Sequence, residues 1–253
     1  IVSAVTDLRT QGATSFVFDF RQNPGGLLDQ ALKISNMFLD DGDVIMQTQE
    51  KDAEPNKIVA SDSEFGDFKI TEPSVLLVDE GSASASEIVA GALQESSEIP
   101  LVGTTTFGKG TVQTVYPLTE SSELKLTVAK WLTPNGNWIH QKGIAVDYEV
   151  ALPEYATLTI IDSTATYEEG IVSEEVKNVE AMLNAIGYAV EADGYYDEAT
   201  VEQVASFQAA NELDATGIVT GDTALAIVEK LREVLTENDT QYDKAVEILM
   251  GNE

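Results

Sequence analysis

The chain has 253 residues, of which 43% are hydrophobic, so it is long enough to bury one large core or two smaller ones. Its 44 acidic and 14 basic side chains give a formal net charge of -30, which disfavours nucleic acid and anionic lipid headgroups as partners. The chain contains no cysteine, which excludes disulfides and thiolate chemistry, and no apolar run of about 18 residues indicates a membrane span.

The first part of the chain reads as alternating helices and strands. It opens with Ile1 rather than Met and enters a helical pattern at once, so we expect that its beginning is missing. Residues 12–20 form an apolar run typical of a buried strand, and after the turn RQNPGG an amphipathic helix is predicted up to Gly42. A strand at 44–49 then leads into a polar loop at 50–66.

Further strand and helix patterns follow as far as about residue 155. Strands are predicted at 74–78, 101–103, 111–118 and 124–132, and a helix is predicted at 84–93. This alternation indicates an α/β domain whose loops carry the functional residues.

The composition changes after about residue 157. Residues 151–253 carry 22 acidic and only 4 basic side chains, and helical patterns dominate there. Helices are predicted at 173–186, 198–210 and 221–235, with a short fourth at 242–250. The sequence therefore predicts a small all-α module after the α/β domain.

Ser84 lies where the apolar strand turns through Gly81-Ser-Ala into a helix. The first amides of a helix have no partner within it, and the helix dipole favours negative charge there. The N–H of Ala85 is therefore a candidate oxyanion donor beside a serine nucleophile. Serines in such turns are more often helix caps, and Ser82 and Ser86 are rival nucleophiles on sequence alone.

Lys109, in the stretch FGKGTVQ, is the candidate base for such a serine. The chain has a single histidine, His140, so a serine nucleophile without it needs another base, and a neutral lysine amine can serve. If the following strand starts at the lysine, side-chain alternation places Lys109 and Gln113 on one face, where the glutamine could orient the amine. A solvated loop lysine and a Ser-His-Asp triad through His140 are the alternatives.

Other acidic residues are less specific signals. Glu87, at the start of the same helix as the serine, is read as a capping or salt-bridge acid. The acids Asp193, Asp197 and Glu198 could suggest calcium, but Gly194 does not fall where a calcium-binding loop requires it. We therefore predict no metal and no cofactor.

The stretches GSASASEI and TFGKGTVQ together resemble the catalytic core of the C-terminal processing (tail-specific) peptidases, a family of serine–lysine proteases. The resemblance implies a crotonase-like α/β fold, with Ser84 as nucleophile, Lys109 as general base and Gln113 completing the site. The separation of 25 residues between the serine and the lysine also fits the family. The likeness covers residues 1–155, so we expect the N-terminal part of the catalytic domain and the family's PDZ-like domain to be absent.

The turn DFRQNPGG at 19–26 is similar to another motif of the family, D-L-R-x-N-x-G-G. In that motif the glycine pair brings backbone amides to the substrate carbonyl. The resemblance implies a second oxyanion donor at Gly25 or Gly26, with Gly26 preferred, while Arg21 and Asn23 brace the turn. Without the resemblance, the glycines would indicate only a tight turn.

The helical part resembles the peptidoglycan-binding type 1 domain. The matching motifs are D-G-x-[YF]-x-x-x-T at 193–200, V-x-x-F-Q at 204–208 and T-G-x-V at 216–219. Most of their residues, such as Phe207 and Ile218, are expected in the core, so the resemblance supports the fold more directly than glycan binding.

Together these features predict a serine–lysine protease core at 1–155, a linker at 156–172, a three-helix peptidoglycan-binding-like domain at 173–236 and a tail at 237–253. We expect an extracytoplasmic bacterial serine endopeptidase, membrane-anchored or secreted in full length, that hydrolyses proteins or peptides and could bind peptidoglycan through 173–236. The alternatives are a non-catalytic cell-wall-binding scaffold with a degenerate protease fold, and a hydrolase of small esters or amides. The sequence sets no oligomeric state.

Overall fold

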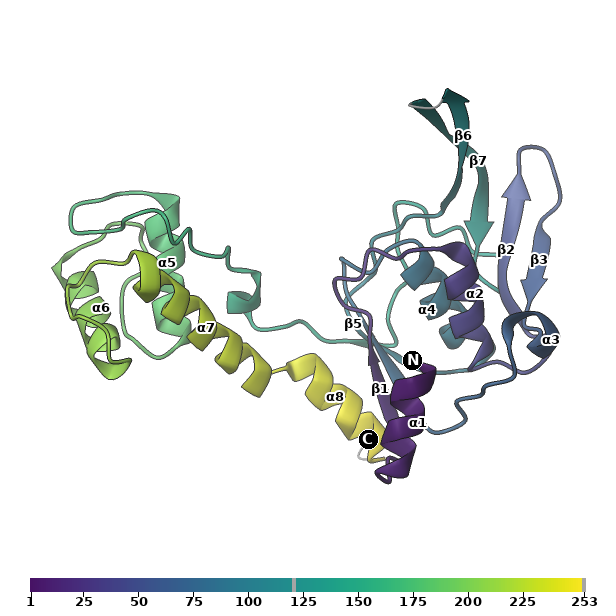
Figure 1. Ribbon diagram of the computed structural model, residues 1–253, viewed down its shortest axis with the longest axis horizontal. Coiled ribbons are helices and arrows are strands. Elements are labelled where there is room, and N and C mark those ends of the chain that lie inside the picture. The colour runs from purple at the N-terminus through teal and green to yellow at the C-terminus, as the bar shows by residue number, and fades with distance from the viewer. Residues whose placement is uncertain (120–121, 252–253) are drawn as a thin grey trace. The chain divides into compact units, whose positions relative to one another are not determined.

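The computed structural model describes residues 1–119 and 122–251, which divide into two compact units (Figure 1). Unit 1 comprises Ile1–Ala151 together with Gln241–Glu253, and unit 2 comprises Leu152–Thr240. The chain therefore leaves unit 1 after Ala151 and returns to it at Gln241, so unit 1 is discontinuous in sequence.

Unit 1 is a mixed α/β structure with two sheets. Its strands are β1 (Phe16–Asp19), β2 (Val44–Glu50), β3 (Asn56–Val59), β4 (Ser74–Val78), β5 (Leu101–Gly103), β6 (Thr111–Thr119), β7 (Ser122–Leu132) and β8 (Tyr148–Glu149). Its helices are α1 (Val2–Thr10), α2 (Leu28–Asn36), α3 (Asp62–Phe65), α4 (Ala85–Ser96) and α8 (Thr240–Leu249). The first sheet is parallel, in the order β1-β4-β5-β8, and the second is antiparallel, in the order β3-β2-β7-β6. The predicted α/β class is confirmed.

Strand β4 is buried on both faces, which explains its unbroken apolar sequence. Leu76 and Val78 point into the larger core, to which α2 and α4 contribute, whereas Val75 and Leu77 point to the opposite face. Helix α8 covers that second face, and its Ala245 is fully buried against it. The expected tail at 237–253 thus contains the helix that completes the sandwich around the parallel sheet.

The topology of this sheet places two turns next to each other. Strands β1 and β4 are adjacent and parallel, with Asp19 paired to Leu77 at their carboxyl ends. The turn at 20–26 follows β1, and the turn at 79–84 follows β4. Because the carboxyl ends of neighbouring parallel strands lie at one edge of a sheet, the candidate serine and the candidate glycine pair meet there.

Unit 2 consists of three α-helices, α5 (Glu174–Ala185), α6 (Glu198–Ala210) and α7 (Gly221–Glu237), preceded by a short 3-10 turn at Glu154–Thr157. Its core is apolar and includes the fully buried Leu183, Tyr196 and Phe207. This confirms the predicted three-helix module. The segment 156–172, expected as a linker, lies within this unit and supplies Ile161 and Tyr167 to the core.

Glu180 in α5 is fully buried in unit 2 and pairs with no cation among the residues that the structure describes. Its carboxylate accepts hydrogen bonds from Gly194 N–H at 2.9 Å and from Thr200 Oγ1 at 3.3 Å. Desolvation by burial raises the pKa of this carboxyl, which the two hydrogen bonds only partly counteract. A raised folded-state pKa favours folding below the unfolded pKa, and this contribution is lost as the pH rises through the folded pKa.

We therefore expect Glu180→Gln to raise the melting temperature of unit 2 by several degrees at pH 7 and to flatten its dependence on pH above about 4.3, the ordinary glutamate value. Glutamine keeps an acceptor for Gly194 and a donor for Thr200. The matched control is Glu202→Gln, which removes an exposed charge from α6 and should change stability by less than about 0.5 kcal/mol. Thermal unfolding between pH 4 and 8 checks both, and equal pH profiles for wild type and Glu180→Gln would contradict the prediction.

Candidate active site

Ser84 closes the turn between β4 and α4 and is the residue that precedes the first turn of that helix. Its backbone has φ 57° and ψ -114°, a conformation that residues other than glycine rarely adopt. A strained turn between a strand and a helix is also what exposes the nucleophilic serine in α/β hydrolases. Ser84 also caps α4 in a capping box with Glu87, as serines in such turns commonly do, and its strained backbone is of the kind that clusters at active sites.

Ser84 is also the most accessible of the three serines in this turn. Ser82 is fully buried; its hydroxyl donates to Phe20 O at 2.8 Å and accepts from Asp79 N–H at 3.0 Å. Ser86 is only 3% exposed, whereas Ser84 is partly exposed. The two rivals are therefore structural in this conformation, and Ser84 is the hydroxyl that a substrate can reach.

The carboxylate of Glu87 joins the serine turn to the loop that carries Lys109. Glu87 is fully buried, and its Oε2 accepts the N–H groups of Ser84 and Lys109, both at 2.8 Å. Its Oε1 accepts the N–H of Gly108 and the hydroxyl of Thr106, both at 2.6 Å. Four donors thus satisfy a buried carboxylate that has no ion pair among the described residues. The expected capping role is confirmed, and the bonds to the lysine loop extend it.

The loop around Lys109 is held by its backbone. Lys109 O accepts the indole N–H of Trp131 at 2.8 Å, and Gly110 O accepts that of Trp138 at 2.9 Å. Gly108 has a φ of 88°, and a Cβ there would meet a backbone nitrogen at 2.7 Å, so the position needs glycine. The lysine side chain is partly exposed, and its amine forms no ion pair within the described part of the chain.

Among the described residues, no hydrogen bond joins the Gln113 side chain to the lysine amine. Strand β6 begins at Thr111, two residues after Lys109, so the alternation of side chains starts beyond the lysine. Gln113 is exposed, and its Nε2 lies 3.5 Å from Thr127 Oγ1 on β7. Among the described residues, no hydrogen bond joins Ser84 Oγ to Lys109 Nζ either. The structure thus links the serine and lysine backbones through Glu87 and leaves Gln113 on the hairpin.

The turn after β1 packs Gly25 against the serine turn. A Cβ at Gly25, whose φ is 93°, would lie 2.5 Å from Ala83 O and 2.7 Å from Ala85 N. Asn23 holds the turn, because its carbonyl accepts Ala83 N–H and its Oδ1 accepts Gly25 N–H, each at 3.0 Å. Asn23 therefore braces the turn as the motif suggested, and the close approach of Gly25 explains why this position is glycine.

Two of the three candidate oxyanion donors have an unused N–H. Gly25 N–H is taken by Asn23, whereas the N–H groups of Ala85 and Gly26 have no acceptor in the described part of the chain. Gly26 is exposed, and a Cβ there would meet nothing within 4 Å. Ala85 and Gly26 can therefore each offer a hydrogen bond to a bound molecule without breaking an existing one.

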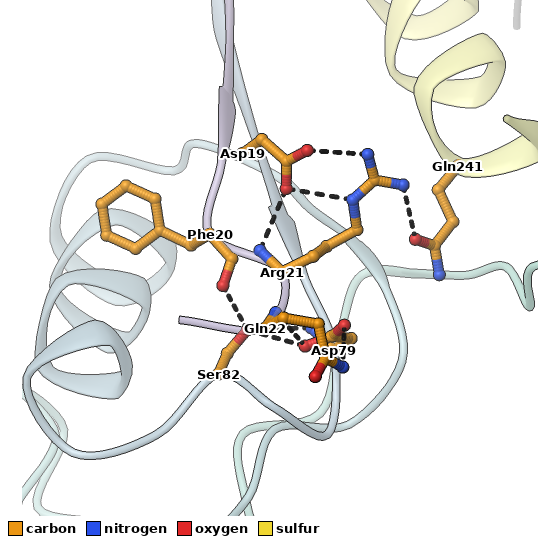
Figure 2. Close-up of polar contacts among 7 residues, drawn as sticks. All are labelled: Asp19, Phe20, Arg21, Gln22, Asp79, Ser82 and Gln241. Atoms are coloured by element: carbon orange, nitrogen blue, oxygen red, sulfur yellow. Dashed lines mark hydrogen bonds and ion pairs between the residues drawn. The ribbon is translucent and has the colours of Figure 1, made fainter. Parts of the chain in front are cut away.

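Asp79, which the sequence analysis did not single out, ties the two turns together (Figure 2). Its Oδ1 accepts the N–H groups of Gln22 at 2.8 Å and Gly81 at 2.9 Å, and its Oδ2 accepts from the Gln22 side chain at 2.8 Å. Gln22 is itself strained, with a φ of 55°. The available signal was an aspartate directly after a buried strand and two residues before a Gly-Ser pair, which is typical of a side chain that bonds its own turn.

His140 forms no catalytic triad among the described residues. Its ring stacks on Trp138 with centroids 5.4 Å apart, and its Nδ1 is buried without a hydrogen-bond partner. No group of three or more His, Asp or Glu side chains in the described chain is arranged to hold a metal ion. The candidate groups at this site are the Ser84 hydroxyl, the Lys109 amine and the backbone N–H groups of Ala85 and Gly26.

Comparison with known proteins adds independent evidence. The family model "Peptidase family S41" matches residues 1–150, and the model "Putative peptidoglycan binding domain" matches residues 172–227. The carboxy-terminal processing protease CtpA of Bacillus subtilis (strain 168) is 45% identical over 249 residues, which are 98% of this chain and 53% of that protein. A "Probable CtpA-like serine protease" of Staphylococcus aureus (strain N315) is 39% identical over 247 residues, 97% of this chain and 49% of that protein. The chain thus spans about half the length of these relatives.

A solved structure shares the fold of unit 1. The photosystem II D1 C-terminal processing protease superposes with a TM-score of 0.53 and 34% identity, covering 60% of this chain and 39% of its own. This likeness supports the predicted protease-type α/β core.

The bonds of Glu87 predict the effect of removing its charge. Glu87→Gln would place an amide NH₂ against at least two N–H or O–H donors, so we expect it to destabilise unit 1 by about 2–4 kcal/mol. Glu64→Gln, which removes an exposed charge from α3, is the matched control and should change stability by less than about 0.5 kcal/mol. Urea unfolding measures both, and a Glu87→Gln variant as stable as wild type would show that the carboxylate does not hold the loops.

Proposed function

Because the chain belongs to peptidase family S41, we propose that it carries the catalytic residues of a C-terminal processing serine endopeptidase, with Ser84 as nucleophile and Lys109 as general base. The observation that carries this assignment is the Glu87 carboxylate, which binds the backbone amides of both residues at 2.8 Å. A shared acceptor holds the two backbones in fixed relation. Catalytic hydrogen bonds such as one between the hydroxyl and the amine often tighten only when substrate is bound.

The free donors and the two side chains supply the steps of peptide hydrolysis. Ser84 Oγ attacks the carbonyl carbon of the scissile bond while Lys109 Nζ accepts the hydroxyl proton. The lysine then gives this proton to the leaving amine, and an acyl ester remains on Ser84. Water then attacks the ester carbonyl while the same amine accepts a proton from it, and the lysine returns this proton to Ser84 Oγ as the C–O bond to the serine breaks and the acid product leaves. The N–H groups of Ala85 and Gly26 stabilise the oxyanion in both halves of the reaction.

Gln113 is assigned the orientation of the lysine amine. This role requires its side chain to turn away from Thr127, and the 3.5 Å contact between them is at the limit of a hydrogen bond. A neutral amide can hold an amine without the charge that would stabilise its ammonium form, as a carboxylate would.

The relatives and the family match of unit 2 support an assignment of substrate class and cellular location. We assign protein or peptide substrates in the bacterial cell envelope, with residues 173–236 binding peptidoglycan, because 172–227 match a domain described for that role. None of the described helices is long and apolar enough to cross a membrane. A net charge of -30 disfavours nucleic acid. The protease names of the relatives do not favour the alternative of a non-catalytic scaffold.

Loss of either proposed catalytic group should abolish proteolysis. In the full-length gene product, we expect Ser84→Ala and Lys109→Ala each to lower the rate of casein cleavage by about a thousandfold or more. Lys142→Ala, which removes an exposed lysine from a neighbouring loop, is the matched control and should retain most activity. Circular dichroism of every variant checks that it is folded. Cleavage by Ser84→Ala at the wild-type rate would refute the assignment and return attention to Ser82, Ser86 and His140.

The glycine pair offers a second test, with its own internal control. Gly25→Ala should lower kcat about a hundredfold, because the new Cβ would meet Ala83 O at 2.5 Å and push the turn away from the serine. Gly26→Ala should keep kcat within a few fold, since its Cβ enters open space and its N–H is retained. Equal effects of the two substitutions would contradict the geometry proposed for this turn.

A further inference from the structure

A residue near the far end of the chain contacts the turn that carries the candidate oxyanion donor. Gln241, in the first turn of α8, is 1% exposed. Its Oε1 accepts from Arg21 Nη1 at 3.1 Å, and its Nε2 donates to Val150 O at 2.8 Å (Figure 2 shows the contact with Arg21). Both ends of a buried side-chain amide are thus used, which fixes its orientation.

Arg21 is part of the turn at 20–26, so its hydrogen bond to Gln241 connects α8 to this turn directly. Its guanidinium also binds Asp19, with Nη2 2.7 Å from Oδ2 and Nε 3.0 Å from Oδ1. The next residue, Gln22, bonds Asp79 through its backbone and its side chain. Figure 2 shows Arg21 between Gln241 and Gln22, and a shift of Arg21 would move the strained Gln22 beside it. The glycine pair follows Gln22 in the same turn, at 25 and 26.

Helix α8 also docks through apolar contacts that do not involve Gln241. Helix α8 already buries Ala245 against the second face of the parallel sheet, and Ile248 packs on the same apolar cluster. A buried polar group costs free energy unless it is hydrogen-bonded, so an apolar residue would serve simple packing as well. The bonds to Arg21 and Val150 therefore indicate a role beyond covering the sheet.

The second contact lies where the chain leaves unit 1. Val150 directly precedes Ala151, the last residue before unit 2, and Gln241 is the first residue after unit 2. The Gln241 side chain thus connects the residue before the chain enters unit 2, the residue after it leaves unit 2, and the turn that follows β1. All three positions belong to unit 1.

We propose that Gln241 is a positioning residue of the protease: it holds Arg21, and through Arg21 it keeps the turn at 20–26 where Gly26 N–H faces the reacting carbonyl. The proposal rests on the serine endopeptidase function, since it takes Gly26 as an oxyanion donor. Gln241 itself touches no reacting atom. If Gln241 has this role, α8, which follows unit 2 in sequence, helps to position the active site.

The test compares three variants of the full-length gene product. Gln241→Ala removes both contacts, Gln241→Glu keeps an acceptor for Arg21, and Ile248→Val loosens only the apolar packing of α8. We expect Gln241→Ala to lower kcat for labelled casein about tenfold or more while KM changes less than about twofold, because oxyanion contacts act in the transition state. The amides of Gln22 and Gly25 should also exchange with deuterium about tenfold faster.

The other two variants separate positioning from general destabilisation. Gln241→Glu should recover kcat to within about threefold of wild type. Ile248→Val should lower the urea midpoint and leave kcat and the exchange of the two amides unchanged. The proposal would be overturned if the amides of Gln22 and Gly25 exchanged at the wild-type rate in Gln241→Ala. It would also be overturned if Gln241→Glu lowered kcat as much as Gln241→Ala does, since the contact with Val150 would then be the one that matters.

Failure of the proposed function has a different signature. If Ser84→Ala, assayed in parallel, cleaves like wild type, the nucleophile assignment falls. The exchange measurement needs no catalytic activity, so it still decides whether Gln241 holds the turn.

Discussion

The candidate site depends on one buried carboxylate. Glu87 lies at the start of α4 with both oxygens occupied, and its donors come from the serine turn and from the loop that carries Lys109. A buried carboxylate without a cation is tolerated only when donors surround it, so separating the two loops would leave a charge unsatisfied in the core. The relation between the Ser84 and Lys109 backbones is therefore a consequence of satisfying Glu87.

The same principle organises the other half of the site. Asp79 joins the serine turn to the turn after β1, again through backbone and side-chain N–H donors. The chain carries 44 acidic side chains, yet these two acids are buried and act as acceptors for backbone amides. Such anchoring uses backbone groups, and within the described part of the chain it leaves the N–H groups of Ala85 and Gly26 without an acceptor and the Lys109 amine without an ion pair.

The parallel sheet explains why the end of the chain matters for its beginning. Both faces of β4 are apolar, and the second face is covered by α8, which follows unit 2 in sequence. A protease core whose sheet is completed by a returning helix depends on residues on both sides of unit 2. Gln241 adds a polar contact to this packing at the edge where the two turns meet.

Local patterns in the sequence determined the α/β class, the helices of unit 2, the existence of α8 and the capping role of Glu87, because each depends on residues a few positions apart. The motif resemblance singled out Ser84 and Lys109 in the same way. Tertiary structure alone decided the partners across long separations: Glu87 with the lysine loop, Gln241 with Arg21, and the segment 156–172 with the core of unit 2. The sequence shows that an apolar helix face must be covered and that a buried acid must accept hydrogen bonds, because both are costly to leave without partners. Which surface covers the helix, or which amide donates to the acid, depends on residues far away in sequence and is determined only by the folded chain.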